Sequence, residues 1–324
     1  MCCLFGMIDY HHTLSEKQKK RVLACLSTAC ESRGTDATGI AYNAGGKLCI
    51  YKRPWPAHFM HFHVPRESTA VMGHTRMATQ GTASRNRNNH PFPGKAAGTS
   101  FALAHNGIIY NDDVLRSTLS LPATKIETDS YIAVQLLERK NALNFSSLRS
   151  MAEQLRGSFT ITVLDGQNNL YIVKGDNPMC LYHYPALGLY LYASTEEILK
   201  QALQRSGLQL GKAESVPLGC GEILKIHPSG KMERSQFDAQ YFSLGLSLYH
   251  WPCTVQPQIA PAMDETYLEE LKSVAMTFGY TPEEIDHLID LGFDAGEIEE
   301  FLYCGSPQRI RQGGYDLWEE TNWI

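Results

Sequence analysis

The sequence predicts an α+β fold in which mostly antiparallel sheets are covered by helices. Short strand patterns, several of them joined by tight hairpin-like turns, lie among amphipathic helical patterns between residues 1 and 227. Turns this short connect antiparallel neighbours, whereas a doubly wound parallel sheet needs a long crossover between successive strands. The 324-residue chain is 43% hydrophobic and 19% charged, which is typical of a globular protein with room for about two domains.

The first predicted elements are a buried strand and an amphipathic helix. Residues 1–10 are apolar enough for a buried strand. Ser15 and Gln18 have the spacing of a capping box, in which each side chain bonds the other residue's backbone N–H at the start of a helix. An apolar face follows at helical spacing, at Val22, Leu23, Leu26 and Ala29.

A hairpin and two further strands are predicted next. The turn "SRGTDATG" leads into the strand "GIAYN", and "KLCIYKR" is the expected hairpin partner of that strand. "TAVMGHTRMAT" begins as a strand and ends in a polar loop. We expect the buried strand in "TSFALAHNGIIYN" to stop at Asn106 and Gly107, because Asn-Gly suits a turn with positive φ.

The following region mixes helices with short strands. Thr128 and Asp129 are expected to start the helix "SYIAVQLLER", and a second helix covers residues 145–156. From 158 to 227 we expect strands at "SFTITVLD", "LYIVKG", "LYLYAS" and "GEILKIH", interrupted by the helix "TEEILKQAL". "YHYPALGLYLYA" is interpreted as a hairpin with half-buried tyrosines and not as a base-stacking surface, since the net charge is −5.

The C-terminal part is predicted to be a small acidic helical appendage. The expected organisation is a domain over 2–240, a proline-containing linker over 241–265, an acidic helical module over 266–305 and a tail over 306–324. The module contains three helical patterns, at 266–278, 282–291 and 295–303. We interpret it as a solvated acidic face, and a contact surface for a basic protein partner is a further hypothesis. Its expected inward-facing residues are Leu288, Leu291, Phe293, Ile298 and Phe301.

Composition and short motifs narrow the functional classes. A net charge of −5 and a pI of about 6.2 argue against a general nucleic-acid binder. We expect no membrane association and a cytoplasmic location, because no apolar run is long enough to span a bilayer and the start lacks the pattern of a secretion signal. Nine cysteines without a C-x-x-C pair indicate free thiols in a reducing compartment. His58, His61 and His63 lack a nearby cysteine or acid to complete a tetrahedral site, so we expect neither a metal nor another cofactor.

The opening "MCCLFG" places a thiol at the second residue. If Met1 is removed, Cys2 carries both a thiol and an α-amine, and the pKa of an α-amine is near 8. The amine can take the thiol proton, directly or through a water, so that the thiolate attacks a carbonyl carbon. The nitrogen of Cys3 lies in a peptide bond and cannot act in this way. The alternative is that both cysteines are merely small buried residues.

Four polar stretches could complete such a site, and each also has a structural explanation. Arg76 in "HTRMATQG" could hold a substrate carboxylate or form a structural ion pair. Asn106 and Gly107 could supply two donors to an oxyanion or form a tight turn. Asp129 in "ETDS" could receive a substrate ammonium or cap a helix. "SRGTDATG" could bring Arg33 and an acid to the site or form a turn.

Taken together and in this order, the stretches resemble the class II glutamine amidotransferases, which are N-terminal-nucleophile (Ntn) hydrolases. That family begins its mature chain with a catalytic Cys followed by Gly-Ile-hydrophobe-Gly. It then shows R-G-x-D, H-T-R-W-A-T-H-G, N-x-H-P, H-N-G-x-I-x-N and T-D-[ST]. The chain has "CCLFG", "RGTD", "HTRMATQG", "NNHP", "HNGIIYN" and "TDS". The resemblance implies a four-layer αββα sandwich of two mostly antiparallel sheets, with the helical appendage in addition.

The resemblance also implies how the reaction proceeds. Cys2 is the nucleophile and its α-amine is the base, while Asn106 and the Gly107 N–H form the oxyanion hole. Attack on the side-chain amide of glutamine releases ammonia and leaves a thioester, which water hydrolyses to glutamate.

The implied substrate-binding residues surround that nucleophile. Arg76 binds the glutamine α-carboxylate, with Thr79 and Gly81 shaping the same pocket. Asp129 binds the α-ammonium, and Arg33 supports the nucleophile end of the site. Glutamine fits this arrangement of charges, since the pocket offers a cation, an anion and a thiol.

Three departures from the family pattern affect the lid over the substrate. Cys3 replaces a glycine, Met77 replaces a tryptophan, and Gln80 replaces a histidine of the loop. We expect the glutaminase chemistry to survive these changes, while closure over glutamine and its coupling to an acceptor differ.

Three functions agree with these observations. The chain has no S-G-G-x-D motif and no Walker loop, and the segment after residue 235 is shorter than the synthase domains of larger family members. The first hypothesis is a glutaminase-type subunit that delivers ammonia to a separate synthase chain. The second is a free hydrolase of glutamine or another γ-glutamyl amide. The third is a non-catalytic binding protein on the same fold.

Overall fold

Two antiparallel sheets form the middle of the first of two units, Met1–Thr254 and Val255–Ile324. The computed structural model describes residues 2–239, 265–277, 280–290 and 298. The seven-stranded sheet has the order β11 (Glu214–Ser215), β9 (Cys180–Tyr184), β10 (Leu189–Ala193), β1 (Cys3–Asp9), β4 (Ala70–Arg76), β2 (Ala37–Ala44) and β3 (Lys47–Arg53). The six-stranded sheet has the order β13 (Met232–Gln236), β12 (Glu222–Ile226), β8 (Leu170–Lys174), β7 (Gly157–Asp165), β6 (Thr99–Ile109) and β5 (Phe92–Ala96).

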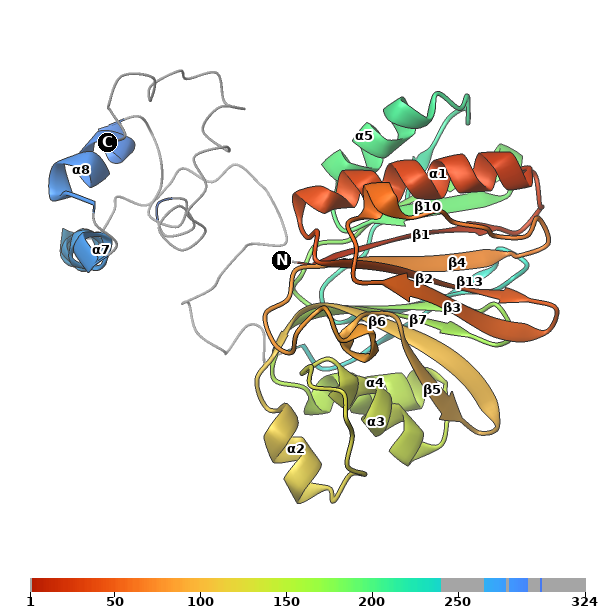
Figure 1. The fold of residues 1–324 in the computed structure, drawn as a ribbon, viewed down its shortest axis with the longest axis horizontal. Coiled ribbons are helices and arrows are strands. Elements are labelled where there is room, and N and C mark those ends of the chain that lie inside the picture. The colour runs from red at the N-terminus through yellow and green to blue at the C-terminus, as the bar shows by residue number, and fades with distance from the viewer. Residues whose placement is uncertain (1, 240–264, 278–279, 291–297, 299–324) are drawn as a thin grey trace. The chain divides into compact units, whose positions relative to one another are not determined.

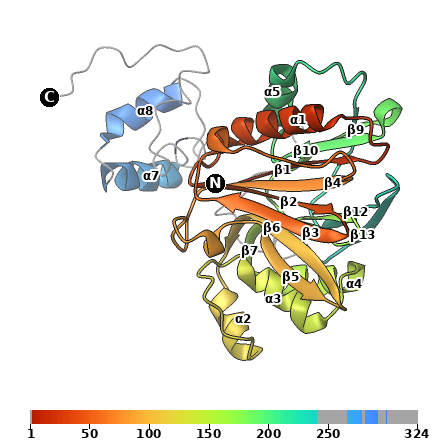
Figure 2. The same cartoon turned by 45° about the vertical axis from the view of Figure 1, so that its right-hand side comes forward.

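Helices cover the outer face of each sheet (Figures 1 and 2). Helices α1 (Glu16–Ala29) and α5 (Glu196–Ser206) pack on the seven-stranded sheet, and their apolar residues share a buried cluster with β1 and β10. Helices α3 (Tyr131–Lys140) and α4 (Phe145–Gln154) pack on the six-stranded sheet, with the short α2 (Asp112–Thr118) beside them. A third cluster fills the space between the sheets. The predicted four-layer α+β sandwich is confirmed.

Local sequence signals account for many of the elements. Ser15 and Gln18 form the predicted capping box at the start of α1, and the apolar face from Val22 to Ala29 is buried. The predicted hairpin is the pair β2–β3, in which Thr38 lies opposite Arg53. The second predicted hairpin is the pair β9–β10, joined by a single 3₁₀ turn (Pro185–Leu187). Strands β5 and β13 and helix α2 have no counterpart among the predicted elements.

Two boundary predictions are wrong. Strand β6 does not stop at Asn106 and Gly107 but continues to Ile109, because its pairing with β7 extends to Gly157. Asp129 is not the N-cap of α3, because the cap position is Ser130 and no side chain bonds to the first helical N–H groups. The carboxylate of Asp129 is therefore available for contacts elsewhere.

The second unit contains two described helices around a small core. Leu271 and Ala275 of α7 (Glu265–Thr277) pack with Ile285 of α8 (Pro282–Asp290) and with Ile298. Ile298 is buried as predicted, but the side chains of Leu288, Leu291, Phe293 and Phe301 lie outside the described residues. The predicted linker and tail also lie outside them, apart from residue 265. None of the helices in the described ranges has both the length and the apolar content to cross a bilayer.

Candidate active site

Strand alternation points Cys2 and Asn106 into the same space between the sheets. On β1, Leu4 and Ile8 face the six-stranded sheet, and on β6 Ala104 faces back toward them in the same buried cluster. Side chains two residues apart on a strand share a face. Cys2 precedes Leu4 by two positions and therefore shares its face of β1. Asn106 follows Ala104 by two positions and shares its face of β6. Both side chains thus point between the sheets, at the same end of the sandwich.

A histidine contact connects the two sheets at this end. Nε2 of His74, on β4, bonds the carbonyl oxygen of His105, on β6, at 3.0 Å. Because a carbonyl oxygen only accepts, the Nε2 atom of His74 carries the proton. His74 is also paired in register with Leu4 of β1. Burial lowers the pKa of His74 to about 3, so this ring is neutral and acts as a fixed donor.

The surroundings of Cys2 hold its thiol in the protonated form. The Cys2 side chain is partly buried, and its Sγ donates to the carbonyl oxygen of Met77 at 3.5 Å. Burial raises the pKa of the thiol above its ordinary value, while the Met77 backbone and the Arg76 guanidinium oppose that rise. Arg33 donates from Nε to the carbonyl oxygen of Cys2 at 3.0 Å and so fixes the backbone of this residue. A reaction at this sulfur therefore needs a base.

Arg76 holds the loop that follows β4. Its guanidinium donates to Oδ1 of Asn89 at 2.7 Å and to the carbonyl oxygens of Gln80 and Gly81 at 2.6 and 2.8 Å. These three bonds use three of the five N–H donors of arginine, including both of those on Nη2. The side chain is only 3% exposed, and burial lowers its pKa while leaving it charged.

Asp129 lies close enough to Cys2 and Arg76 for its negative charge to act toward a higher pKa at both groups. Its Oδ2 accepts a hydrogen bond from the backbone N–H of Ile109 at 2.7 Å, and Oδ1 accepts one from the Ser130 hydroxyl at 3.2 Å. The side chain is 5% exposed. The carboxylate is therefore held in place by two donors near the Arg76 guanidinium.

Asn106 is a buried amide without a partner. Its side chain is fully buried, and neither Nδ2 nor Oδ1 has a hydrogen-bond partner within the described part of the chain. Leaving such a group unsatisfied costs about 1–3 kcal/mol. Next to it, Gly107 has φ of 143°, and a Cβ there would lie 1.9 Å from the carbonyl oxygen of Ser158. The close approach of β7 requires glycine at this position.

The loop after Arg76 carries the other two predicted pocket residues. Thr79 is exposed, as are its neighbours from Met77 to Gln80. Gly81 has φ of 71°, a conformation that suits glycine. Two contacts outside Arg76 fix the loop. The N–H of Ala78 donates to Asp36 at 2.7 Å, and Oε1 of Gln80 accepts from the N–H of Asp129 at 3.1 Å.

Sequence reasoning gave no role to two residues beside Arg76. Lys52, on β3, donates from Nζ to the carbonyl oxygens of Asn89 and Pro91. Burial, together with the nearby Arg76, lowers the pKa of Lys52 to about 8. Asn89 lies in the "NNHP" motif and is the acceptor for the Arg76 guanidinium. A lysine in an edge hairpin gives no sequence signal of this kind, because β pairing alone brings it to Asn89.

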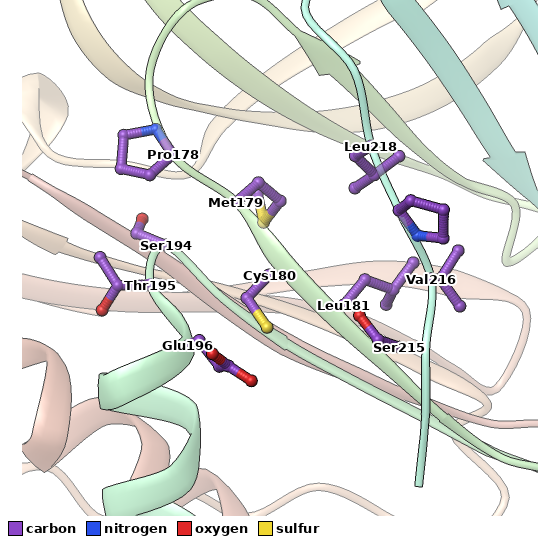
Figure 3. Close-up of a pocket in the computed structure, with 11 residues that line it drawn as sticks. Pro178, Met179, Cys180, Leu181, Ser194, Thr195, Glu196, Ser215, Val216 and Leu218 are labelled. Carbon is purple, nitrogen blue, oxygen red and sulfur yellow. The ribbon is translucent and has the colours of Figure 1, made fainter. Parts of the chain in front are cut away.

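The histidine cluster and one surface cavity contain none of the predicted site residues. His58 bonds the Glu31 carboxylate at 2.9 Å, and Nδ1 of His63 lies 3.3 Å from the carbonyl oxygen of His61. A cavity of about 360 Å³ opens between β9, β11 and the start of α5 (Figure 3). None of the predicted site residues lines this cavity, although Ser194 at its edge accepts a bond from the N–H of Leu4 at 2.9 Å.

Comparisons with known proteins place these residues in a family context. A family model described as a glutamine amidotransferase domain matches residues 74–201, which include Arg76, Asn106 and Asp129 but not Cys2. The glutamine–fructose-6-phosphate aminotransferase (isomerizing) of Geobacillus kaustophilus is 32% identical over 187 residues, which cover 55% of this chain and 30% of that protein. The protein of the same name from Bacillus thuringiensis is 30% identical over the same shares. The alignments thus span less than a third of the length of these relatives.

A solved structure agrees with the architecture. The glutamine phosphoribosylpyrophosphate amidotransferase of B. subtilis, complexed with ADP and GMP, superposes with a TM-score of 0.57. The superposition covers 73% of this chain and 49% of that one, at 20% identity. At this level of identity the likeness shows that the fold is shared.

Proposed function

The chain contains a class II glutamine amidotransferase domain, and from this premise we propose that it hydrolyses the side-chain amide of glutamine through Cys2. The Cys2 sulfur attacks the amide carbon, ammonia leaves, and the acyl group remains on sulfur as a thioester. Water then attacks the thioester, giving glutamate and the free thiol. The proposed domain extends over residues 2–240.

The unpartnered amide of Asn106 carries this proposal. A fully buried side chain with two unsatisfied polar atoms is costly, and such groups are kept where a ligand completes them. By strand alternation Asn106 shares its face of β6 with Ala102 and Ala104, which pack in one cluster with Leu4 and Ile8 of β1. We assign its Nδ2, with the Gly107 N–H, to the oxygen that becomes negative when sulfur adds to the amide.

The neighbouring charges support glutamine as the substrate. We assign the positive charge of Arg76 to the α-carboxylate, and the fixed carboxylate of Asp129 suits the α-ammonium. Thr79 and Gly81 border the same loop, and Arg33 fixes the Cys2 backbone. When Arg76 and Asp129 hold the α-carboxylate and α-ammonium of glutamine, the Cys2 thiol is proposed to lie against its side-chain amide.

The base is proposed to be the α-amine of Cys2 itself. The thiol needs deprotonation because burial raises its pKa. The Nε2 proton of His74 is used for the carbonyl of His105, and the low pKa of this ring makes it a weak base. Removal of Met1 would free an amine with a pKa near 8 next to the sulfur.

The fate of the ammonia is the second part of the proposal. The curated relatives are aminotransferases, and the alignments span only 30% of their length. We propose that a separate synthase chain takes up the ammonia. Helices α7 and α8 contain seven Asp or Glu residues and one Lys or Arg, Lys272, which is paired to Asp286 at 2.7 Å, so a basic partner surface fits them. Binding that weakens as salt rises would support that contact.

A labelling experiment tests the nucleophile. The intact protein is weighed before and after reaction with a diazoketone analogue of glutamine, and the labelled peptide is sequenced. We expect loss of Met1 and one label on Cys2. Cys2→Ala should lose both the label and glutamine hydrolysis with its fold intact, whereas Cys180→Ala, which removes another partly buried thiol, should keep both. Retention of Met1 in the active protein, or a label on a different sulfur, would refute the assignment.

A kinetic experiment separates the acceptor hypotheses. Ammonia release is measured with the chain alone and with candidate synthase chains and their acceptors. Slow release that rises with a partner supports the amidotransferase. Fast release that no partner changes would show a free hydrolase, and no release under any condition would leave a binding protein.

A further inference from the structure

Two thiols outside the proposed reaction lie in contact directly behind the nucleophile. Sγ of Cys3 and Sγ of Cys30 are 2.9 Å apart, although 27 residues separate them in the chain. Cys3 is the first residue of β1, and Cys30 begins the short 3₁₀ helix (Cys30–Ser32) that follows α1. Both are free thiols, and both side chains are fully buried.

The strand geometry excludes Cys2 from this pair. Cys3 faces the helical layer with Phe5 and Met7, in the cluster that also contains Cys30. Cys2 lies on the opposite face of the strand, toward the other sheet. The Cys2 thiol therefore points away from Cys3 although the two residues are adjacent in sequence, and the thiol in contact with Cys3 is that of Cys30.

The two thiols differ in their readiness to ionise. Burial raises the pKa of Cys3, but hydrogen bonds shared with Cys30 and Ser194, together with the charge of Arg33, bring it below its ordinary value. Burial and the nearby Cys3 sulfur hold the pKa of Cys30 well above its ordinary value. The thiol with the lowered pKa, Cys3, therefore has the character of an attacking cysteine, and Cys30 has that of a resolving cysteine.

We propose that Cys3 and Cys30 form a redox-active dithiol that hydrogen peroxide oxidises reversibly to a disulfide, and that closing this disulfide slows the reaction at Cys2. The Cys3 thiol gives up its proton and its sulfur attacks one peroxide oxygen, forming a sulfenic acid, while the other oxygen leaves as hydroxide and takes up that proton to become water. The Cys30 sulfur then displaces the hydroxyl group, and its proton leaves with that group as water. The two thiols lose two electrons and two protons, and peroxide is reduced to two molecules of water.

Closing the disulfide displaces groups that hold Cys2. The sulfurs must approach by about 0.9 Å to reach the bonded distance of about 2.0 Å. Arg33 connects the two places, because its backbone N–H donates to the carbonyl oxygen of Cys30 and its Nε to that of Cys2, both at 3.0 Å. Thr75 also donates to the Cys30 carbonyl, at 3.1 Å. A shift of this size at a reacting group can cost up to about 100-fold in rate.

The experiment uses the full chain, reduced and then treated with a small excess of hydrogen peroxide. After alkylation of free thiols and proteolysis, we expect the Cys3 peptide linked to the Cys30 peptide, lighter than the sum by two hydrogens. Dithiothreitol should separate them. Glutamine hydrolysis should fall by about tenfold or more and return on reduction.

Two variants complete the test. Cys30→Ala should lose both the cross-link and the reversible fraction of the inhibition. Cys25→Ala is the matched control, since it removes a thiol of the preceding helix α1 that packs against the same core, and it should behave as the wild type. Because the cross-link is read in the wild-type chain, a variant that fails to fold does not decide the result.

Other results of this experiment would refute either the dithiol or its coupling to Cys2. Free Cys3 and Cys30 after Cys2 has been oxidised, or a Cys2–Cys3 bridge, would refute the dithiol. A Cys3–Cys30 cross-link with unchanged hydrolysis would refute the coupling to Cys2. The coupling rests on the proposed function, but the cross-link does not. A reduced chain that never hydrolyses glutamine would therefore refute that function and leave the dithiol in place.

Discussion

Replacing Asn106 with leucine is expected to make the protein more stable and almost inactive. The Asn106 amide is fully buried, and neither of its polar atoms has a partner in the described structure. Leucine has nearly the same shape and no polar group to leave unsatisfied. Removing the desolvation cost should raise the free energy of unfolding by about 1–3 kcal/mol.

The same substitution removes a proposed oxyanion donor. Loss of one such donor costs about 100- to 1,000-fold in kcat, or about 3–4 kcal/mol of transition-state stabilisation. The perturbation thus moves stability and activity in opposite directions. A residue that served only as packing would move both in the same direction or leave activity unchanged.

The assay pairs denaturant unfolding with steady-state glutamine hydrolysis on Asn106→Leu. Thr128→Val is the matched control, because the Thr128 hydroxyl is also buried and has no hydrogen-bond partner among the described residues. This control should gain stability with activity close to that of the wild type. If Asn106→Leu unfolds at lower denaturant and still hydrolyses glutamine, both the missing partner and the oxyanion role are wrong.

Two further predictions concern charge. Arg76→Lys keeps the positive charge but loses the planar guanidinium fork. Because charge-assisted hydrogen bonds are worth about 1.5–3 kcal/mol, kcat/KM for glutamine should fall by about 10- to 100-fold, mainly through a higher KM. Unchanged steady-state kinetics would contradict the proposed role of Arg76. The pKa of His74 is about 3 in the folded protein and 6.5 in the free side chain. Between pH 3 and pH 6.5 the His74 side chain is therefore protonated in the unfolded chain but neutral in the folded one. Stability present above pH 6.5 should therefore be lost as the pH falls toward 3, by at most about 5 kcal/mol from this group. Urea unfolding of His74→Gln between pH 4 and 7 should show a shallower acid slope than the wild type, and parallel slopes would refute the linkage.

Much of the fold and several candidate site residues could be predicted from local patterns. The capping box at Ser15 and the β2–β3 hairpin are signals that lie within a few residues, and the structure contains both. Arg76, Asn106 and Asp129 were identified because they stand in short motifs in a fixed order.

Pairing between distant segments overruled two local signals. Asn-Gly at residues 106 and 107 suits a turn, but pairing with β7 keeps both residues in a continuous strand. Asp129 stands where a helix cap is expected, yet its carboxylate bonds to Ile109 at the end of β6. In both places a long-range hydrogen bond satisfies a buried polar group, and the cost of leaving that group unsatisfied exceeds a local preference.

The order of motifs, the amphipathic helices and the antiparallel architecture are properties of the sequence by itself, because each depends on the spacing of residues along one segment. Only the tertiary structure decided that Cys3 meets Cys30, that Lys52 lies against Asn89, and that the Asn106 amide is left without a partner. These contacts arise from the stacking of sheets and helices, which joins residues far apart in the chain. Periodicity specifies which face a side chain occupies, but not which residue of another element it will meet there.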